Sequence, residues 1–199
     1  MASLHGIDWS EGSPAELAMA VRPPNESPPR RAARASPTRT VLGLLGICAL
    51  TNALACILAS HLIWNQTASL PLGVYARSPG VHVSEGVLVA LRVPPAVRPL
   101  VLERHYLPAG SLLIKPVAAV AGDHVCVRRG ILFINGAPFG AVLPRDSEDR
   151  ELPVYAGCGV LVEGQVFLAS HHPRSFDSRS FGPVDVHTLQ GTVSPIWTF

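Results

Sequence analysis

The chain has 199 residues, a formal net charge of +2, and 48% hydrophobic residues against 15% charged ones. This length leaves room for one domain of ordinary size with an anchor and a tail, and it argues against two large globular domains. The small net charge, without basic clusters interleaved with aromatic residues, argues against a nucleic-acid partner. The apolar composition indicates instead that one stretch is solvated by lipid.

The first 40 residues are rich in proline and arginine and have no sustained apolar period. The prolines are Pro23, Pro24, Pro28, Pro29 and Pro37. Such a composition cannot bury enough apolar surface to offset the entropy lost on ordering the chain. We therefore predict a disordered tail without a fold of its own over residues 1–40.

Residues 41–64 are apolar, and none of these 24 residues is Asp, Glu, Lys or Arg. At about 1.5 Å per residue they are long enough to cross a hydrocarbon core of about 30 Å. A cleaved signal peptide and a buried core helix are the alternatives. The apolar region of a signal peptide is normally only about 7 to 15 residues and lies near the N-terminus, whereas this run follows a 40-residue leader. We therefore predict one transmembrane helix.

The charges beside the span predict its orientation. Four arginines precede the span, at Arg30, Arg31, Arg34 and Arg39. The C-terminal flank has only His61 before Arg77. Because positively charged flanks stay on the cytoplasmic side, we expect a cytoplasmic N-terminus and an extracytoplasmic domain over residues 65–199.

Two cysteines fall in the part that we expect to be exported. An oxidising compartment could join Cys126 and Cys158 in a disulfide. No Cys/His spacing indicates zinc, and the neighbouring His171 and His172 fit a surface loop better than a metal site. We predict neither a metal nor another cofactor.

Short apolar runs punctuated by glycine and proline predict a mainly β domain after the span. The runs cover residues 86–93, 111–120, 124–127, 131–134 and 164–169. Asn135-Gly136 follows one run directly, and this dipeptide is typical of a tight hairpin turn.

Ser69 is a candidate nucleophile, because it follows the predicted span by five residues and would lie near the membrane surface, where a membrane-bound substrate emerges. Pro71 and Gly73 would make a turn and leave space for a peptide backbone. The alternative is that this segment is only a polar linker.

A serine hydroxyl needs a base, and Lys115 is the candidate. It lies in a run that otherwise has no charge, so a strand there would remove at least its stem from water. Desolvation lowers the pKa of a lysine and can make the amine a base near neutral pH. The alternative is an edge strand in which Lys115 reaches solvent and Pro116 blocks further pairing.

A third polar segment contains Ser175, Asp177 and Ser178, any of which could orient Lys115. A charged Asp177 directly against the lysine would raise the lysine pKa, so it could instead pair with Arg179. The alternative is a surface turn with a local ion pair.

Taken together, these segments resemble signal peptidase I, and more closely its conjugative-transfer (TraF-type) branch. The resemblance covers residues 65–199 and rests on residues 67–75, on 113–115 with Gly122-Asp123, on Asn135-Gly136 and on residues 175–182. The C-terminal Pro195-Ile-Trp197-Thr also resembles this branch.

The resemblance implies specific roles. Ser69 would be acylated, with its own amide and the Thr67 hydroxyl binding the oxyanion, and Lys115 would be the base, oriented by Ser175 and Asp177. It implies a mainly β, signal-peptidase-like (LexA-like) catalytic domain, here on one transmembrane helix in a bacterial inner membrane and facing the periplasm.

The chain departs from ordinary signal peptidases at Ser69-Leu70 and Lys115-Pro116, where those enzymes have Ser-Met and usually a basic residue after the lysine. These departures favour the transfer-type branch. The resemblance thus implies a serine endopeptidase that cleaves signal peptides or pilin-like precursors, in conjugative transfer or type IV secretion. Its expected partners are a membrane-associated precursor and the lipid bilayer.

Three other functions remain open: a general signal peptidase I, a non-catalytic membrane-anchored assembly factor, and a self-cleaving repressor. The presence of both Ser69 and Lys115 counts against the assembly factor. The apolar span and the lack of a DNA-binding helix pair count against the repressor.

Overall fold

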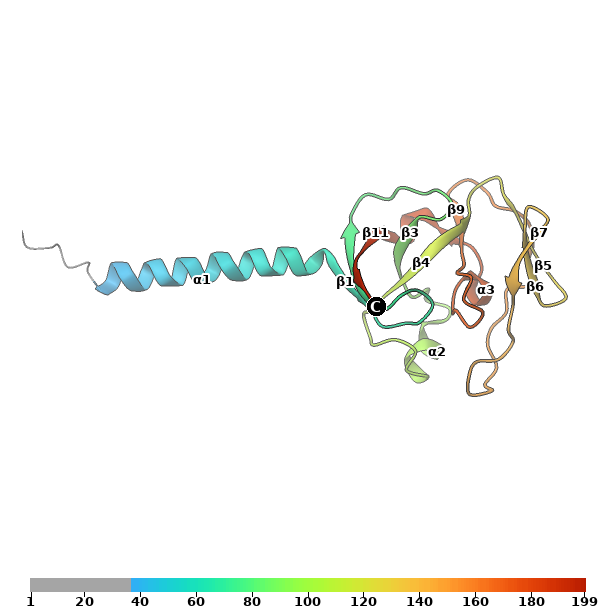
Figure 1. The fold of residues 1–199 in the computed structure, drawn as a ribbon, viewed down its shortest axis with the longest axis horizontal. Coiled ribbons are helices and arrows are strands. Elements are labelled where there is room, and N and C mark those ends of the chain that lie inside the picture. The colour runs from blue at the N-terminus through green and yellow to red at the C-terminus, as the bar shows by residue number, and fades with distance from the viewer. Residues whose placement is uncertain (1–36) are drawn as a thin grey trace, which may run out of the picture. The chain divides into compact units, whose positions relative to one another are not determined.

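The computed structural model describes residues 37–199, which form one long apolar helix and a mainly β domain (Figure 1). The helices are α1 (Pro37–Ser60), α2 (Arg98–Glu103), α3 (Ser178–Phe181) and the 3-10 turn η2 (Val186–Thr188). The strands are β1 (Leu62–Asn65), β2 (Gly73–Ser78), β3 (Leu88–Arg92), β4 (Leu112–Ala119), β5 (His124–Arg128), β6 (Ile131–Ile134), β7 (Ala137–Ala141), β8 (Cys158–Val160), β9 (Gln165–Leu168), β10 (Val184–Asp185) and β11 (Leu189–Thr198). The predicted mainly β architecture is confirmed.

Helix α1 is long and apolar enough to cross a membrane, with 24 residues and a mean hydropathy of 2.3 in its most apolar window. The structure describes this helix from Pro37 onward. The helix ends at Ser60, so the predicted boundary at Trp64 is wrong. Ile63 and Trp64 favour extended structure and belong to β1, which pairs with β2.

The predicted disordered tail falls mostly outside the described residues, which begin at Pro37. Residues 37–40 were predicted to belong to that tail, but they form the first turn of α1.

A seven-stranded antiparallel sheet has the order β1-β2-β11-β3-β4-β9-β10. The C-terminal strand β11 therefore lies between β2 and β3. β4 lies between β3 and β9, so the alternative that placed Lys115 on an edge strand is wrong. Pro116 is tolerated there because the neighbouring Val117 N–H donates to the carbonyl of Val87, just before β3, whereas the Pro116 carbonyl accepts from the Ala169 N–H beyond the end of β9.

A second sheet of four strands has the order β7-β6-β5-β8. Asn135 and Gly136 connect β6 to β7, with φ angles of 50° and 82°. Positive φ at both central residues is what a type I′ hairpin requires, and the predicted turn is confirmed.

Three groups of buried apolar side chains stabilise the domain. The largest lies between the seven-stranded sheet and α2 and includes Val89, Leu91, Val101 and Leu168. A second group packs the four-stranded sheet against β9, where Phe167 is fully buried. A third contains Tyr75 and Ile114. These cores hold β4 and the β1–β2 connection in fixed positions, on which the site below depends.

Candidate active site

Ser69 lies in the loop between β1 and β2, and the buried side chain of Asn65 organises this loop. The Asn65 amide nitrogen donates to the carbonyls of Thr67, Leu70 and Pro71 at 3.0, 3.3 and 3.0 Å. Its carbonyl oxygen accepts from the amide and the hydroxyl of Thr67 at 3.2 and 3.0 Å. One side chain therefore satisfies five backbone or hydroxyl groups and fixes the loop around Ser69.

The end of the loop is held against the C-terminal strand. Gly73 has a φ of 141°, and a Cβ atom there would lie 2.1 Å from the Trp197 carbonyl oxygen. The prediction that Gly73 leaves space for the backbone of a bound peptide is therefore wrong, because the backbone of β11 fills that space. The buried Tyr75 hydroxyl also donates to the Pro71 carbonyl at 2.8 Å.

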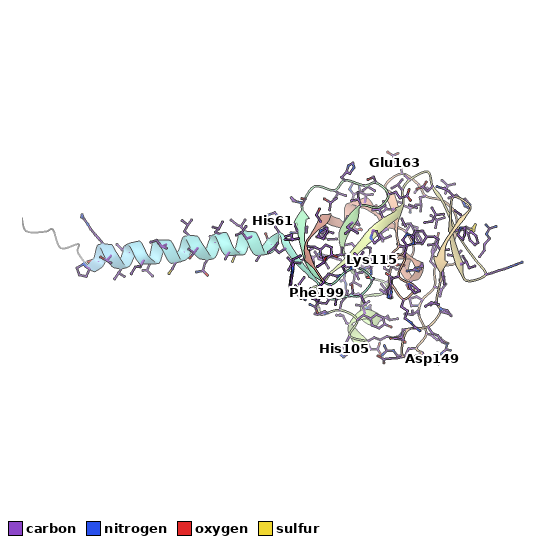
Figure 2. All side chains as sticks on the ribbon, in the orientation of Figure 1. His61, His105, Lys115, Asp149, Glu163 and Phe199 are labelled. Carbon is purple, nitrogen blue, oxygen red and sulfur yellow. A yellow bond between two sulfur atoms is a disulfide. The ribbon has the colours of Figure 1, made fainter. Side chains whose placement is uncertain are left out.

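Lys115 lies in the middle of β4, and its side chain is 2% exposed (Figure 2). Its Nζ lies 2.5 Å from the Oγ of Ser69, although 46 residues separate the two along the chain. The position of Lys115 on β4 directs its side chain toward the β1–β2 loop, which carries Ser69. The structure thus brings the predicted nucleophile and base into hydrogen-bond contact.

Burial lowers the pKa of Lys115 from 10.5 to about 8. The charge of Asp177 opposes this shift and the charge of Arg179 reinforces it. A substantial fraction of the amine is therefore neutral near pH 8, and a neutral amine can accept the proton of Ser69.

Ser175 supplies the second contact of the lysine, with Oγ 3.0 Å from Nζ. Among residues 37–199, the hydrogen-bond partners of the amine are Ser69 and Ser175, and Asp177 is not one of them. Of the two residues predicted to orient the lysine, Ser175 therefore does so by contact.

Asp177 pairs with Arg179, which was the alternative raised from the sequence. Its side chain is 0% exposed and accepts from Arg179 Nε at 2.9 Å and from an Arg179 terminal nitrogen at 2.8 Å. The same arginine donates to the carbonyls of Ala141, Ser170 and His172. The interpretation of this segment as an exposed turn is wrong, because the pair is buried and ties the loop before Ser175 to β7.

The pair also resolves how a carboxylate can lie near a lysine that must lose its proton. Arg179 neutralises Asp177 at hydrogen-bond distance. The carboxylate therefore raises the pKa of Lys115 by less than desolvation lowers it, and the net shift stays downward.

A cleft of about 250 Å³ opens beside Ser69 and Lys115. Its apolar lining includes Val101, Leu107, Leu113, Leu143, Leu152 and Phe176. Thr67 and Ser175 also line it, so the predicted site residues border one cavity. An apolar cleft with a few convergent polar groups is typical of a binding site for an organic ligand or a peptide.

The rim of the cleft is formed partly by the loop of residues 143–152, which is held by Asp146. This carboxylate accepts from the Tyr106 hydroxyl, from Arg104 at 3.4 Å and from Arg150 Nε at 2.7 Å. Burial alone would raise the pKa of Asp146, but these hydrogen bonds hold it well below its usual range. Asp146 thus bridges the loop to the segment that follows α2.

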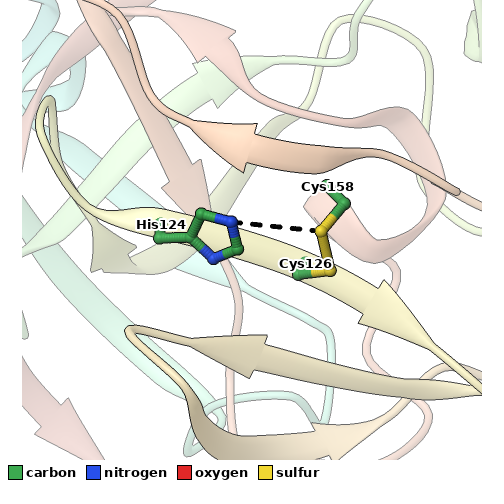
Figure 3. Close-up of a disulfide and its surroundings, with 3 residues drawn as sticks. All are labelled: His124, Cys126 and Cys158. Atoms are coloured by element: carbon green, nitrogen blue, oxygen red, sulfur yellow. Dashed lines mark hydrogen bonds between the residues drawn. A yellow bond between two sulfur atoms is a disulfide. The ribbon is translucent and has the colours of Figure 1, made fainter.

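Cys126 and Cys158 form a disulfide between β5 and β8 (Figure 3). The His124 ring nitrogen lies 4.0 Å from the Cys158 sulfur. The bond lies at one edge of the second sheet, and it anchors β8 at the end of the segment that carries the rim loop. No group of three or more His, Cys, Asp or Glu residues among residues 37–199 is arranged to hold a metal ion.

Sequence reasoning missed two parts of this site, the scaffold role of Asn65 and the Asp146 bridge. Asn65 could have been found from the short Asn-Gln-Thr segment, since an Asn side chain commonly binds the backbone two residues later. The bridge between Tyr106 and Asp146 joins residues 40 positions apart, and no local pattern indicates it.

A serine oxygen within hydrogen-bond distance of a buried amine of lowered pKa can lose its proton and attack a carbonyl carbon. Ser175 holds the amine in line, and the adjacent cleft can accept a polypeptide. Thr67 Oγ1 lies 3.4 Å from Ser69 Oγ and donates to Asn65 in the free protein. The arrangement is suited to acyl transfer.

Comparisons with known proteins identify the family of the chain. A family described as signal peptidase, peptidase S26, matches residues 38–198. The conjugal transfer protein TraF of Agrobacterium fabrum is 35% identical over 176 residues, which cover 81% of this chain and 97% of that protein. A plasmid transfer protein TraF of Escherichia coli is 32% identical over 147 residues, which cover 68% and 82%.

A solved signal peptidase I from Enterococcus faecalis aligns with 57% of this chain and 98% of its own, at 20% identity and a TM-score of 0.35. The family match extends over nearly the whole described chain, and the TraF relatives are matched over more than four fifths of their length. The chain therefore belongs to the signal peptidase family, peptidase S26.

Proposed function

We propose that the protein is a membrane-anchored serine endopeptidase in which Ser69 is the nucleophile and Lys115 the general base. The contact of 2.5 Å between Ser69 Oγ and the buried Lys115 Nζ carries this proposal. Neutral Lys115 takes the Ser69 proton as Ser69 attacks the scissile carbonyl, and the resulting ammonium then protonates the leaving amine. Water, activated by the same amine, releases the acyl group.

The amide of Ser69 would stabilise the oxyanion, and Thr67 would assist it. In the free protein the Thr67 hydroxyl donates to Asn65, so it must turn toward the substrate oxygen in the complex. This requirement makes Thr67 a secondary contributor, and we expect Thr67→Val to retain more activity than Ser69→Ala.

The substrate that we propose is a membrane-associated precursor of a conjugative-transfer apparatus, with a pilin-like subunit as the first candidate. Support comes from the names of the TraF relatives, which are conjugal and plasmid transfer proteins. The apolar α1 and the arginines that precede it support an inner-membrane anchor with the catalytic domain in the periplasm.

The test is processing of a candidate pilin precursor in membranes that carry the full chain, read as a mass shift of the precursor. The matched forms are wild type, Ser69→Ala and Lys115→Met. We expect cleavage by the wild type and a loss of at least about 10³-fold in each variant, since nucleophile and base act as a unit.

Lys115→Met also separates catalysis from folding. Replacing a buried amine by an apolar side chain of similar volume removes a desolvation cost, so the variant should be at least as stable as the wild type. Near-normal cleavage by Lys115→Met would overturn the mechanism. If the wild type, too, leaves a broad panel of precursors intact, the alternative of a non-catalytic assembly factor takes its place.

A further inference from the structure

The rim of the cleft contains one arginine whose guanidinium the fold does not use. Arg174 lines the cleft and directly precedes Ser175, which contacts Lys115. The side chain is exposed, and within residues 37–199 it takes part in no ion pair and no side-chain hydrogen bond. Only its backbone amide is engaged, donating to His172 Nδ1 at 3.2 Å.

The loop that carries Arg174 is held firmly. The Ser175 amide donates to the His172 carbonyl at 3.1 Å, and the buried Arg179 donates to the same carbonyl at 2.9 Å. The backbone on both sides of Arg174 is therefore fixed relative to the catalytic pair, while its charged group stays in solvent at the mouth of the cleft.

The other charges around the cleft are already compensated. Asp146, the one carboxylate among residues 37–199 that lines the cleft, is bound by Arg104 and Arg150. Arg179 is bound by Asp177, and Arg145 lies 3.6 and 3.4 Å from the exposed carboxylates of Asp149 and Glu151. The uncompensated charge at the mouth is thus positive and belongs to Arg174.

We propose that Arg174 binds a carboxylate of the substrate polypeptide close to the scissile bond, and so selects substrates that are acidic there. This inference rests on the proposed peptidase function and names a specificity determinant for it. Arginine suits the role because its planar guanidinium can form two parallel hydrogen bonds to one carboxylate. The carboxylate can come from an Asp or Glu side chain or from the C-terminus of a substrate cut near its end.

The probes are fluorescein-labelled dodecapeptides of alanine and serine in which a single Asp, Asn or Lys is moved through successive positions, each with a free or an amidated C-terminus. Their binding to the full-length Ser69→Ala protein in detergent is measured by anisotropy, which requires no cleavage. Their cleavage by the wild type is measured in parallel by mass.

We expect Asp peptides, at one or two positions, to bind at least about threefold more tightly than the Asn peptides at low ionic strength, with the difference falling as salt is added. Arg174→Gln should remove the difference, and Arg174→Glu should transfer the preference to the Lys peptides. A preference that follows the free C-terminus instead of the Asp position identifies a terminal carboxylate as the ligand.

The matched control is Arg129→Glu, which makes the same charge change on an exposed residue between β5 and β6, outside the cleft. It should retain the wild-type preference. Equal binding of Asp and Asn peptides to the Ser69→Ala protein, or the same loss in Arg129→Glu as in Arg174→Glu, would overturn the inference. Absence of cleavage with a preserved Asp preference would count against the peptidase function alone.

Discussion

Two sets of ion pairs border the cleft, and their surroundings differ sharply. In the interior, the side chains of Asp177 and Arg179 are 0% and 4% exposed. On the rim, Arg145 pairs with Asp149 and Glu151, whose side chains are 49%, 87% and 84% exposed.

An arginine–carboxylate pair therefore contributes differently to stability in the interior and on the rim. In the interior, removing one partner leaves an uncompensated charge out of water, so the pair fixes the loop before Ser175. On the rim, water and salt screen each charge, and the pairs add little to stability. A rigid interior beside an adjustable rim is what a peptidase needs if its chemistry is constant and its substrate preference is not.

The largest effect on stability should come from breaking the interior pair. We expect Asp177→Ala to lower the free energy of unfolding by about 3–5 kcal/mol, because Arg179 then remains buried without its partner. Chemical denaturation of the detergent-solubilised protein measures this. The double variant Asp177→Leu with Arg179→Met should lose less stability than Asp177→Ala, because it leaves no buried charge unpaired. If Asp177→Ala lowers the free energy of unfolding by less than about 1 kcal/mol, the interior pair does not differ from the rim pairs.

The next effect concerns the charge of Lys115. Because the pKa of Lys115 is about 8 in the folded protein and 10.5 in an unfolded chain, the unfolded chain binds an extra proton between these values. Stability should therefore rise as the pH increases from about 8 to 10.5, relative to Lys115→Met. Below pH 8, kcat/KM should fall about tenfold per pH unit as the base is protonated.

Denaturation of wild type and Lys115→Met at pH 7.5 and pH 9.5 tests the stability difference. The wild-type pH profile of peptide cleavage tests the rate. Parallel stability changes in the two proteins would contradict a lowered lysine pKa.

A smaller effect is expected at the bridge across the rim. Asp146→Asn keeps an acceptor for Tyr106 but loses the ion pairs with Arg104 and Arg150. We expect KM to rise with little change in kcat, and a smaller loss of stability than in Asp177→Ala.

Since hydrogen bonds hold the pKa of Asp146 below its usual range, the stability advantage of the wild type over Asp146→Asn should fade as the pH falls below about 4. Thermal melts at pH 7 and pH 3 measure this, and an advantage that grows toward pH 3 would contradict it.

The smallest effect should come from the exposed pairs. Arg145→Gln should change the free energy of unfolding by less than about 0.5 kcal/mol, because both carboxylate partners are well solvated. Denaturation at low and high salt provides the measurement. A loss close to that of Asp177→Ala would show that burial does not separate the two regions.

The sequence predicted much of the fold because its signals are local. The apolar runs gave β3, β4, β5, β6 and β9 to within about two residues at each end. The Asn135-Gly136 turn was predictable because few other residues adopt positive φ twice in succession. The apolar helix α1 was predictable from its lack of charge, although its end was not, since β1 continues the apolar run in another conformation.

The parts that could not be predicted depend on contacts between distant segments. β11 has Gly191 and Pro195 within it and resembles a loop by composition, yet it pairs with both β2 and β3. The distance from Ser69 to Lys115 depends on the sheet order, and their proximity entered the prediction only through the family resemblance. The choice between Ser175 and Asp177 as the contact of the lysine required the side-chain geometry.

The place of β11 in the sheet has a consequence for biosynthesis. β1 and β2 flank the loop that carries Ser69, and β4 carries Lys115; in the sheet these strands are connected through β11 and β3. Residues 189–198, which form β11, are translated after every other strand of the sheet. They must leave the ribosome before β11 can pair with β2 on one side and β3 on the other. A nascent chain that lacks these residues therefore has no complete sheet to bring Ser69 to Lys115. The contact between Ser69 and Lys115 can therefore form only after synthesis of this last strand, so the site that we propose to be catalytic is completed at the end of translation.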